Sequence, residues 1–172
     1  YECFADFIYL DTDEREMLAS SPQDMLIYQV QRVPGVAEGV LDLTFNHPVK
    51  FLTANTNILS TTTAETLKLQ LNGVDVADPK NYTPHFNVVP RYYHCPYLGD
   101  QLGTDDQLEK FLIPFCLDTN KLQPTGSLNF SRLDSARLIT SATFASASTP
   151  IYAVNYNVLR IQNGMGGLLY SN

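Results

Sequence analysis

The sequence has no tryptophan, three cysteines and five lysines, and charged residues make up 17% of its 172 positions. An average globular domain has roughly 25%. The 11 basic and 18 acidic residues give a formal net charge of −7. This balance argues against a nucleic-acid-binding surface, which needs a basic patch. No apolar run approaches the roughly 18–20 residues of a membrane-spanning helix. With 44% hydrophobic residues, the chain is also too apolar for intrinsic disorder.

The three cysteines, Cys3, Cys95 and Cys116, are an odd and widely spaced set, so they indicate neither a disulfide framework nor a Cys-x-x-Cys metal pair. We expect free, buried thiols, which are typical of a reducing compartment. The chain begins at Tyr1, without a methionine and without a signal-peptide pattern. We therefore expect an N-terminal part of the protein to precede it.

The first 33 residues differ in pattern from the rest. Residues 1–10 are aromatic and apolar, and we predict a strand that has no partner nearby in the sequence. We predict that residues 11–33 form a helical linker. Asp11, with Glu14 three residues later, indicates a capping box for a first short helix. The Ser-Pro pair at 21–22 indicates a second helix of about two to three turns that ends before the next Pro-Gly pair.

From residue 36 onward, apolar and polar residues alternate, which is typical of half-buried strands. The segments predicted as strands are 41–45, 67–71, 110–117, 132–140 and 151–162. The Asn72–Gly73 pair directly after the second segment predicts a tight hairpin, because both central positions of such a turn need a positive φ.

Three further features favour two packed sheets. The segment 151–162 is largely apolar on both faces, which indicates cover on both sides. Pro114, in the middle of an apolar run, predicts an edge strand or a bulge. Residues 74–107 are rich in proline and glycine, and we predict a long irregular connection that serves function or an interface. Because no helix is expected after residue 33, we predict an all-β fold, an eight-stranded antiparallel jelly-roll sandwich over residues 34–172.

No catalytic motif is present, so we predict that the protein is not an enzyme and takes no cofactor. The histidines His47, His85 and His94 form no His-x-His pair, and we predict no metal site and a hydrogen-bonded structural role for His47. The glycines within 164–167 are expected in a turn or bulge, because no helix follows to cradle a phosphate. Asn81, in the triplet Asn-Tyr-Thr, is the candidate glycan acceptor if the chain enters a secretory route.

Five strings occur in a recognisable order. They are FADFIYLDTDEREMLASSPQDMLIYQVQ within residues 1–31, FNHPVK at 45–50, LQLNG at 69–73, QPTGSLNFSRLD at 123–134 and YAVNYNVLRIQNGMGGLLYSN at 152–172. Together they resemble the C-terminal part of the major capsid proteins of nucleocytoplasmic large DNA viruses, a group that includes iridoviruses and chlorella viruses. The family usually has a bulky aromatic soon after HPVK, where this chain continues with FLTAN.

This resemblance implies two jelly rolls in tandem and a trimer with a pseudo-hexagonal outline. It implies that residues 1–10 are the last strand of the first jelly roll, that 11–33 are the linker, and that 34–172 are the second jelly roll. The implied function is that of a structural subunit in the capsid shell of an icosahedral double-stranded DNA virus, assembled in the host cytoplasm. The implied partners are two further copies in a homotrimer, neighbouring capsomers and minor capsid proteins, with no direct contact to nucleic acid and no transmembrane segment.

Two alternatives remain open at this point. One is a minor or vertex capsid protein that uses the same fold. The other belongs to a different class, a carbohydrate-binding or cupin-like jelly-roll module, which requires a bound metal or stabilisation by a sugar.

Overall fold

The computed structural model describes residues 2–55, 65–95, 110–141, 143–144 and 150–171. The chain divides into two compact units. One consists of residues 1–27 together with 157–172, and the other of residues 28–156. The larger unit contains the hydrophobic core and most of both sheets.

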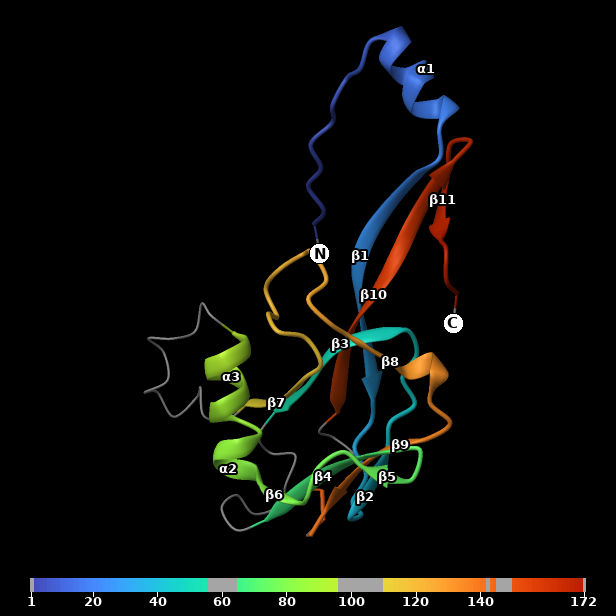
Figure 1. The fold of residues 1–172 in the computed structure, drawn as a ribbon. Helices are drawn as coiled ribbons and strands as arrows, with labels where there is room; N and C mark the ends of the chain where they lie inside the picture. Colours follow the sequence, from blue (N-terminus) through green and yellow to red (C-terminus); the bar gives the residue numbers. More distant parts are fainter. Residues whose placement is uncertain (1, 56–64, 96–109, 142, 145–149, 172) are drawn as a thin grey trace. The chain divides into compact units, whose positions relative to one another are not determined.

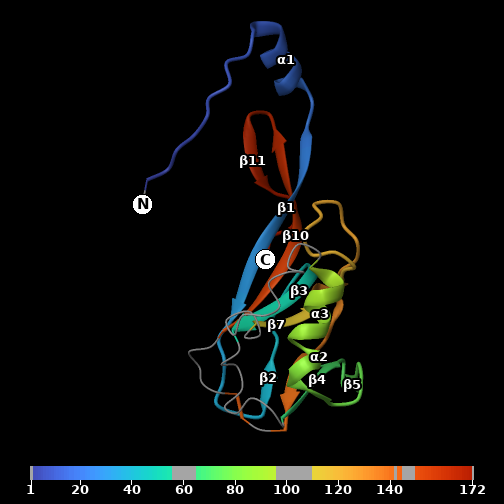
Figure 2. The same ribbon diagram turned by 90° about the vertical axis from the view of Figure 1, so that its left-hand side faces the viewer.

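Two antiparallel sheets form the framework (Figures 1 and 2). The first has the order β1 (Gln23–Val33), β10 (Ile151–Gln162), β3 (Pro48–Asn55) and β7 (Lys110–Pro114), with β8 (Leu128–Asn129) beside β3 and β11 (Met165–Leu168) beside β10. The second has the order β2 (Val40–Asp42), β9 (Ala136–Thr140), β4 (Thr66–Leu71) and β5 (Val74–Asp75), with β6 (Lys80–Asn81) beside β4. Apart from the hairpins β4–β5 and β10–β11, neighbouring strands come from distant parts of the chain, as in a jelly roll.

The core lies where the apolar faces of the two sheets meet. Period-two alternation places Leu52 and Ala54 of β3 and Leu67 and Leu69 of β4 in one buried cluster. The segment 151–162 forms β10 over the predicted range. Its residues 155–157 are all buried, so both faces are covered there, as the sequence predicts.

Both Asn-Gly pairs form hairpin turns. Asn72 and Gly73 have φ values of 50° and 78° and join β4 to β5, which confirms the predicted hairpin. Asn163 and Gly164, with φ values of 54° and 75°, join β10 to β11, so the glycine-rich segment begins with a turn. Pro114 lies in β7 at the end of its sheet, which confirms the prediction of an edge strand.

The first predicted helix is present as α1 (Thr12–Ser20). The Asp11 side chain accepts hydrogen bonds from the Glu14 amide and, at 2.7 Å, from the Thr12 amide. The Glu14 carboxylate accepts one from the Asp11 amide at 3.3 Å, which completes the capping box. Residues 2–10 form no strand with any described part of the chain and are almost all exposed. Their place in an upstream sheet stays a prediction.

The second predicted helix is wrong, because residues 23–33 form strand β1. The β-branched residues Ile27, Val30 and Val33 favour a strand, and β10 supplies the hydrogen-bonding partner that the Ser-Pro signal does not reveal. The expectation of no helix after residue 33 is also wrong. The segment 74–107 contains α2 (Tyr82–His85) and α3 (Val88–His94), and a short 3-10 helix follows β8 at Phe130–Arg132.

The start of α3 is hard to recognise in the sequence, because its cap is followed closely by a proline. The Asn87 side chain accepts a hydrogen bond from the Val88 amide at 2.7 Å and caps α3. Pro90 lies in the first turn, where a helix does not need its missing N–H. Both helices lie beside β7 (Figures 1 and 2), and the Leu112 amide of β7 donates to the Phe86 carbonyl at 2.8 Å. Residues 96–107 of the segment lie outside the described residues.

Candidate functional site

The three histidines have separate surroundings. His47 is buried with a φ of 65°, its amide donates to the Ser131 hydroxyl at 2.8 Å, and its carbonyl accepts from the Phe130 amide at 3.0 Å. This is the structural role predicted for it. His85 packs against Phe86, and His94 Nδ1 lies 3.2 Å from the Leu117 carbonyl. Within the described ranges, no three His, Cys, Asp or Glu side chains are grouped so that they could hold a metal ion.

Asn81, the candidate glycan acceptor, lies at the N-terminus of α2. Its side chain is exposed and makes no capping hydrogen bond. The amide is therefore accessible, and its modification stays a prediction.

The three thiols are free, as predicted, but only partly buried. Cys116 is 4% exposed, Cys95 is half-buried and Cys3 is exposed. Burial raises the pKa of the Cys116 thiol, although the Lys50 ammonium acts against this shift.

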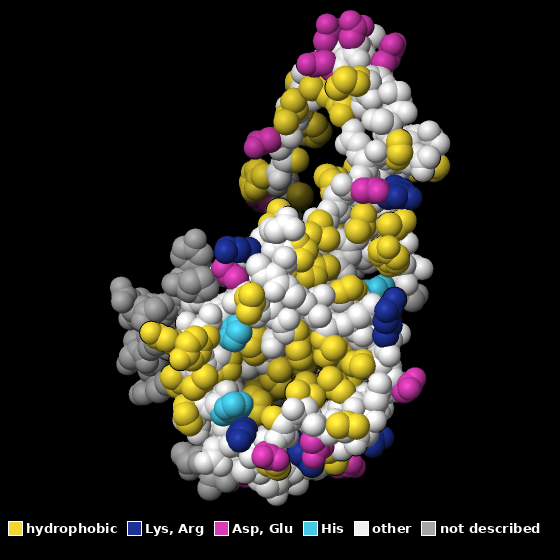
Figure 3. Space-filling view, viewed as in Figure 1, with side chains coloured by type: hydrophobic (Ala, Val, Ile, Leu, Met, Phe, Trp, Pro, Cys, Tyr) yellow, Lys and Arg dark blue, Asp and Glu magenta, His cyan; other side chains and the backbone are white. Residues whose placement is uncertain are grey.

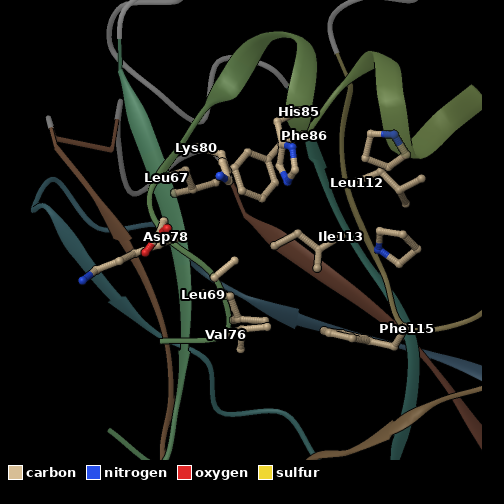
Figure 4. Close-up of a pocket in the computed structure, with 14 residues that line it drawn as sticks. Leu67, Leu69, Val76, Asp78, Lys80, His85, Phe86, Leu112, Ile113 and Phe115 are labelled. Atoms are coloured by element: carbon tan, nitrogen blue, oxygen red, sulfur yellow. The ribbon is translucent and has the colours of Figure 1, made fainter. Parts of the chain in front are cut away.

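An apolar groove of about 220 Å³ opens between the edges of the two sheets. Figure 3 shows yellow side chains gathered in this hollow, and Figure 4 shows its lining from β4, β7, α2 and the segment after β5. The apolar walls include Leu67, Leu69, Phe86, Ile113 and Phe115. The groove exists because this edge of the second sheet consists of only two short strands, β5 and β6.

A second feature lies outside the main core cluster and centres on Lys50. Its side chain is 1% exposed, although lysine is rarely buried. In the pairing of β10 with β3, Val154 faces Phe51 and Asn155 faces Val49, so Lys50 is the extra residue of a β-bulge.

The Lys50 ammonium has acceptors from two other parts of the chain. It donates to the Lys121 carbonyl at 2.9 Å and to the Tyr28 hydroxyl at 3.3 Å, and it lies 4.5 Å from the Tyr28 ring centroid and 5.7 Å from that of Tyr156. The Tyr28 hydroxyl donates to the same Lys121 carbonyl at 2.5 Å. Sequence reasoning missed this group, because a lysine next to the core residue Val49 would ordinarily face solvent.

Burial also affects Tyr156, which is 6% exposed. Desolvation, with a smaller contribution from Tyr28, raises the pKa of Tyr156 to about 12. Elsewhere two carboxylates have lowered pKa values because they accept hydrogen bonds from cations: Asp24 from Arg160 and Asp75 from Lys68.

Large apolar side chains are exposed in both units. In the larger unit they include Tyr92 and Tyr93 of α3 and Leu117 and Leu122 after β7. In the smaller unit they are Phe4, Phe7, Ile8, Tyr9, Met17, Leu18, Met25, Leu26, Met165, Leu168, Leu169 and Tyr170. So many are typical of a protein with broad contacts to partners. In the part of the chain that the structure describes, no helix is both long and apolar enough to span a bilayer.

Solved structures with the same fold are capsid proteins. A structure described as the PBCV-1 virus capsid aligns with a TM-score of 0.73 and 28% identity, covering 95% of this chain and 55% of that one. The Faustovirus major capsid protein, at 13% identity and a TM-score of 0.57, supports the fold alone. The fold is thus the jelly roll of viral capsid proteins, as the sequence predicts.

The sequence comparisons narrow this class. The family model of the large eukaryotic DNA virus major capsid protein matches residues 51–167, and the chain belongs to this family. The major capsid protein of Pyramimonas orientalis virus is 36% identical over 193 residues, which cover 98% of this chain and 48% of that protein. That of Paramecium bursaria Chlorella virus 1 is 29% identical over 241 residues, covering 98% and 53%. The chain therefore spans about half the length of these relatives.

Proposed function

We propose that this chain is the C-terminal jelly roll of a major capsid protein that builds the shell of an icosahedral double-stranded DNA virus. The observation that carries the proposal is the alignment of 95% of the chain with a subunit of the PBCV-1 capsid at a TM-score of 0.73. The role is structural and needs no catalytic residue. It also accounts for the many exposed apolar side chains.

The proposed division of the chain is supported by the length of the relatives, which is about twice that of this chain. Residues 1–10 belong to the last strand of an upstream jelly roll, 11–33 connect the two halves, and 34–172 form most of the second jelly roll. The exposed aromatic residues within 2–10 support the first assignment, because an upstream sheet would bury them. The connection contains α1 and also strand β1, which joins the sheet of the second half.

The partners are copies of the same protein in a homotrimer of pseudo-hexagonal outline, then neighbouring capsomers and minor capsid proteins. Three copies of two similar domains give six similar positions around one axis. The mature location is the virion shell, after assembly in the host cytoplasm. The net charge of −7 favours a shell that does not touch the genome directly. Asn81 is the candidate acceptor if the subunit is glycosylated.

The decisive experiment measures the mass of the purified full-length protein in solution by light scattering. We expect a trimer that persists on dilution, because large complementary surfaces keep the subunits together. A well-behaved monomer at high concentration contradicts the proposal.

Two further measurements separate the alternatives. The copy number per virion distinguishes a major protein from a minor or vertex protein with the same fold. A thermal shift with a panel of glycans, or bound metal by elemental analysis, would favour the carbohydrate-binding or cupin-like alternative.

A further inference from the structure

Residues 115–127, which follow β7, form a segment that we term the strap. Its start is fixed to the β-bulge, because the Phe115 amide donates to the Lys50 carbonyl at 2.9 Å. Its middle is fixed to the same residue, because the Lys121 carbonyl accepts from the Lys50 ammonium at 2.9 Å. One residue thus holds the strap at two points.

A second attachment joins the strap to the end of α3. The Thr119 amide and hydroxyl both donate to the His94 carbonyl, at 2.9 and 2.8 Å. The His94 ring lies within hydrogen-bonding distance of the Leu117 carbonyl. The ring contact lies at the surface, where water can replace it. The Lys50 side chain, by contrast, is 1% exposed, and its bond to the Lys121 carbonyl is partly buried.

The surroundings of Lys50 are unusual because, among the described residues, no carboxylate lies within ion-pair distance of its ammonium. Within the described residues, the ammonium instead contacts a carbonyl, a hydroxyl and two tyrosine rings, which stabilise its charge without neutralising it. A buried ammonium with so little compensation is costly, and water would solvate it well. Opening the strap therefore breaks its bonds to Lys50 but hydrates the charge, and the two effects oppose each other.

We propose that the part of the strap after Phe115 opens and closes as a unit, while Phe115 stays packed against the core and the sandwich stays intact. Lys50 is the positioning residue that sets this balance. Opening gives solvent access to Cys116, which lies within the strap and is 4% exposed when it is closed. It also moves Leu117 and Leu122, two exposed apolar residues of the strap. The apolar surface that the protein presents to partners then depends on the state of the strap. The inference does not depend on the capsid role.

Cys116 provides the test. The full-length protein is treated with iodoacetamide at constant pH, and peptide mass spectrometry measures the alkylation of Cys116 separately from that of the exposed Cys3. We expect a rate of Cys116 labelling that changes little with urea below the unfolding transition, because a local opening exposes little surface. A rate that rises with urea as steeply as global unfolding overturns the proposal.

A double-mutant cycle tests the role of Lys50. Tyr28→Phe removes one acceptor from the charge and one donor to Lys121, so labelling should become about tenfold faster, the size expected for a hydrogen bond to a charged group. In a Lys50→Met background the same change should accelerate labelling less than about threefold, because no charge is left unpaired. Equal effects in both backgrounds overturn the proposal.

Tyr152→Phe is the matched control, because this tyrosine of β10 is 37% exposed and, among the described residues, its hydroxyl forms no hydrogen bond. It should leave the rate within about twofold. The urea measurement uses the unaltered protein, so it decides the question even if Lys50→Met does not fold.

Discussion

At the scale of single residues, the buried Tyr156 makes the stability of the protein depend on pH in the alkaline range. The pKa of Tyr156 is about 12 in the folded protein and about 10 when the chain is unfolded. The folded state therefore keeps its proton where the unfolded state has lost it. The stabilisation is fully present below pH about 10 and is lost as the pH rises towards 12.

We predict that Tyr156→Phe flattens the decline of stability between pH 10 and 12. The decline attributable to this group is at most about 1.4 kcal/mol per pH unit, the value for one proton. Urea unfolding at a series of pH values measures it, with Tyr152→Phe as the control. If the variant and the unaltered protein lose stability in parallel, the burial of Tyr156 does not govern this range.

Lys50 also shows where sequence reasoning stops at this scale. The string FNHPVK supports the family resemblance, but nothing in it indicates a buried ammonium. Burial results from a bulge in β3 and from tyrosines 22 and 106 residues away in the sequence, Tyr28 and Tyr156, which are brought together only by the sheet. The structural role of His47, by contrast, could be predicted because its neighbour Pro48 marks a strand junction.

At the scale of elements, the two Asn-Gly turns have the same backbone but different attachments. The Asn72 side chain accepts from the amides of Asp134 and Ser135, at 2.8 and 3.2 Å, and so links the β4–β5 hairpin to the start of β9. Among the described residues, the Asn163 side chain makes no such hydrogen bond.

We predict that Asn72→Gly destabilises the protein by about 1–2 kcal/mol, because glycine keeps the positive φ but loses both hydrogen bonds. Asn163→Gly should change the free energy of unfolding by less than about 0.5 kcal/mol. Urea unfolding of the two variants makes the comparison. Equal effects would mean that the turn conformation alone matters.

Helices and strands could be predicted where neighbouring residues alone determine the structure. The alternation over 151–162 and the turn at Asn72–Gly73 define both elements from sequence alone, because the pattern and the turn chemistry are local. Strand β1 could not be predicted, because a Ser-Pro pair can precede a helix or a strand. Pairing with β10, which is distant in the sequence, makes the segment a strand. Helix α3 was missed because Pro90 suggests a loop, although a proline is tolerated in a first turn.

At the scale of the whole molecule, the position of β1 changes what a fragment needs in order to fold. A fragment of residues 34–172 retains the segment predicted as the second jelly roll but lacks β1, which ends the sheet beside β10. Its removal exposes the edge of β10 and the apolar residues beneath.

We predict that residues 34–172 expressed alone aggregate, whereas residues 21–172 are more soluble and melt at a higher temperature. Sedimentation and thermal melting of the two fragments side by side measure the difference. A soluble, cooperatively melting monomer from 34–172 would show that β1 is dispensable.

Within the described part of the chain, strand β11 has a free edge that affects how the protein behaves when many copies are made at once. Its four residues, Met165–Leu168, contain no charge and no proline, two are glycines, and all are exposed. Charged residues and prolines in an edge strand usually prevent incorrect β-pairing between chains. Among the described residues this strand is bonded on one side only, to β10. Newly made chains at high concentration therefore expose an unprotected strand edge. The correct neighbour of β11 must bind this edge before another copy of β11 pairs with it.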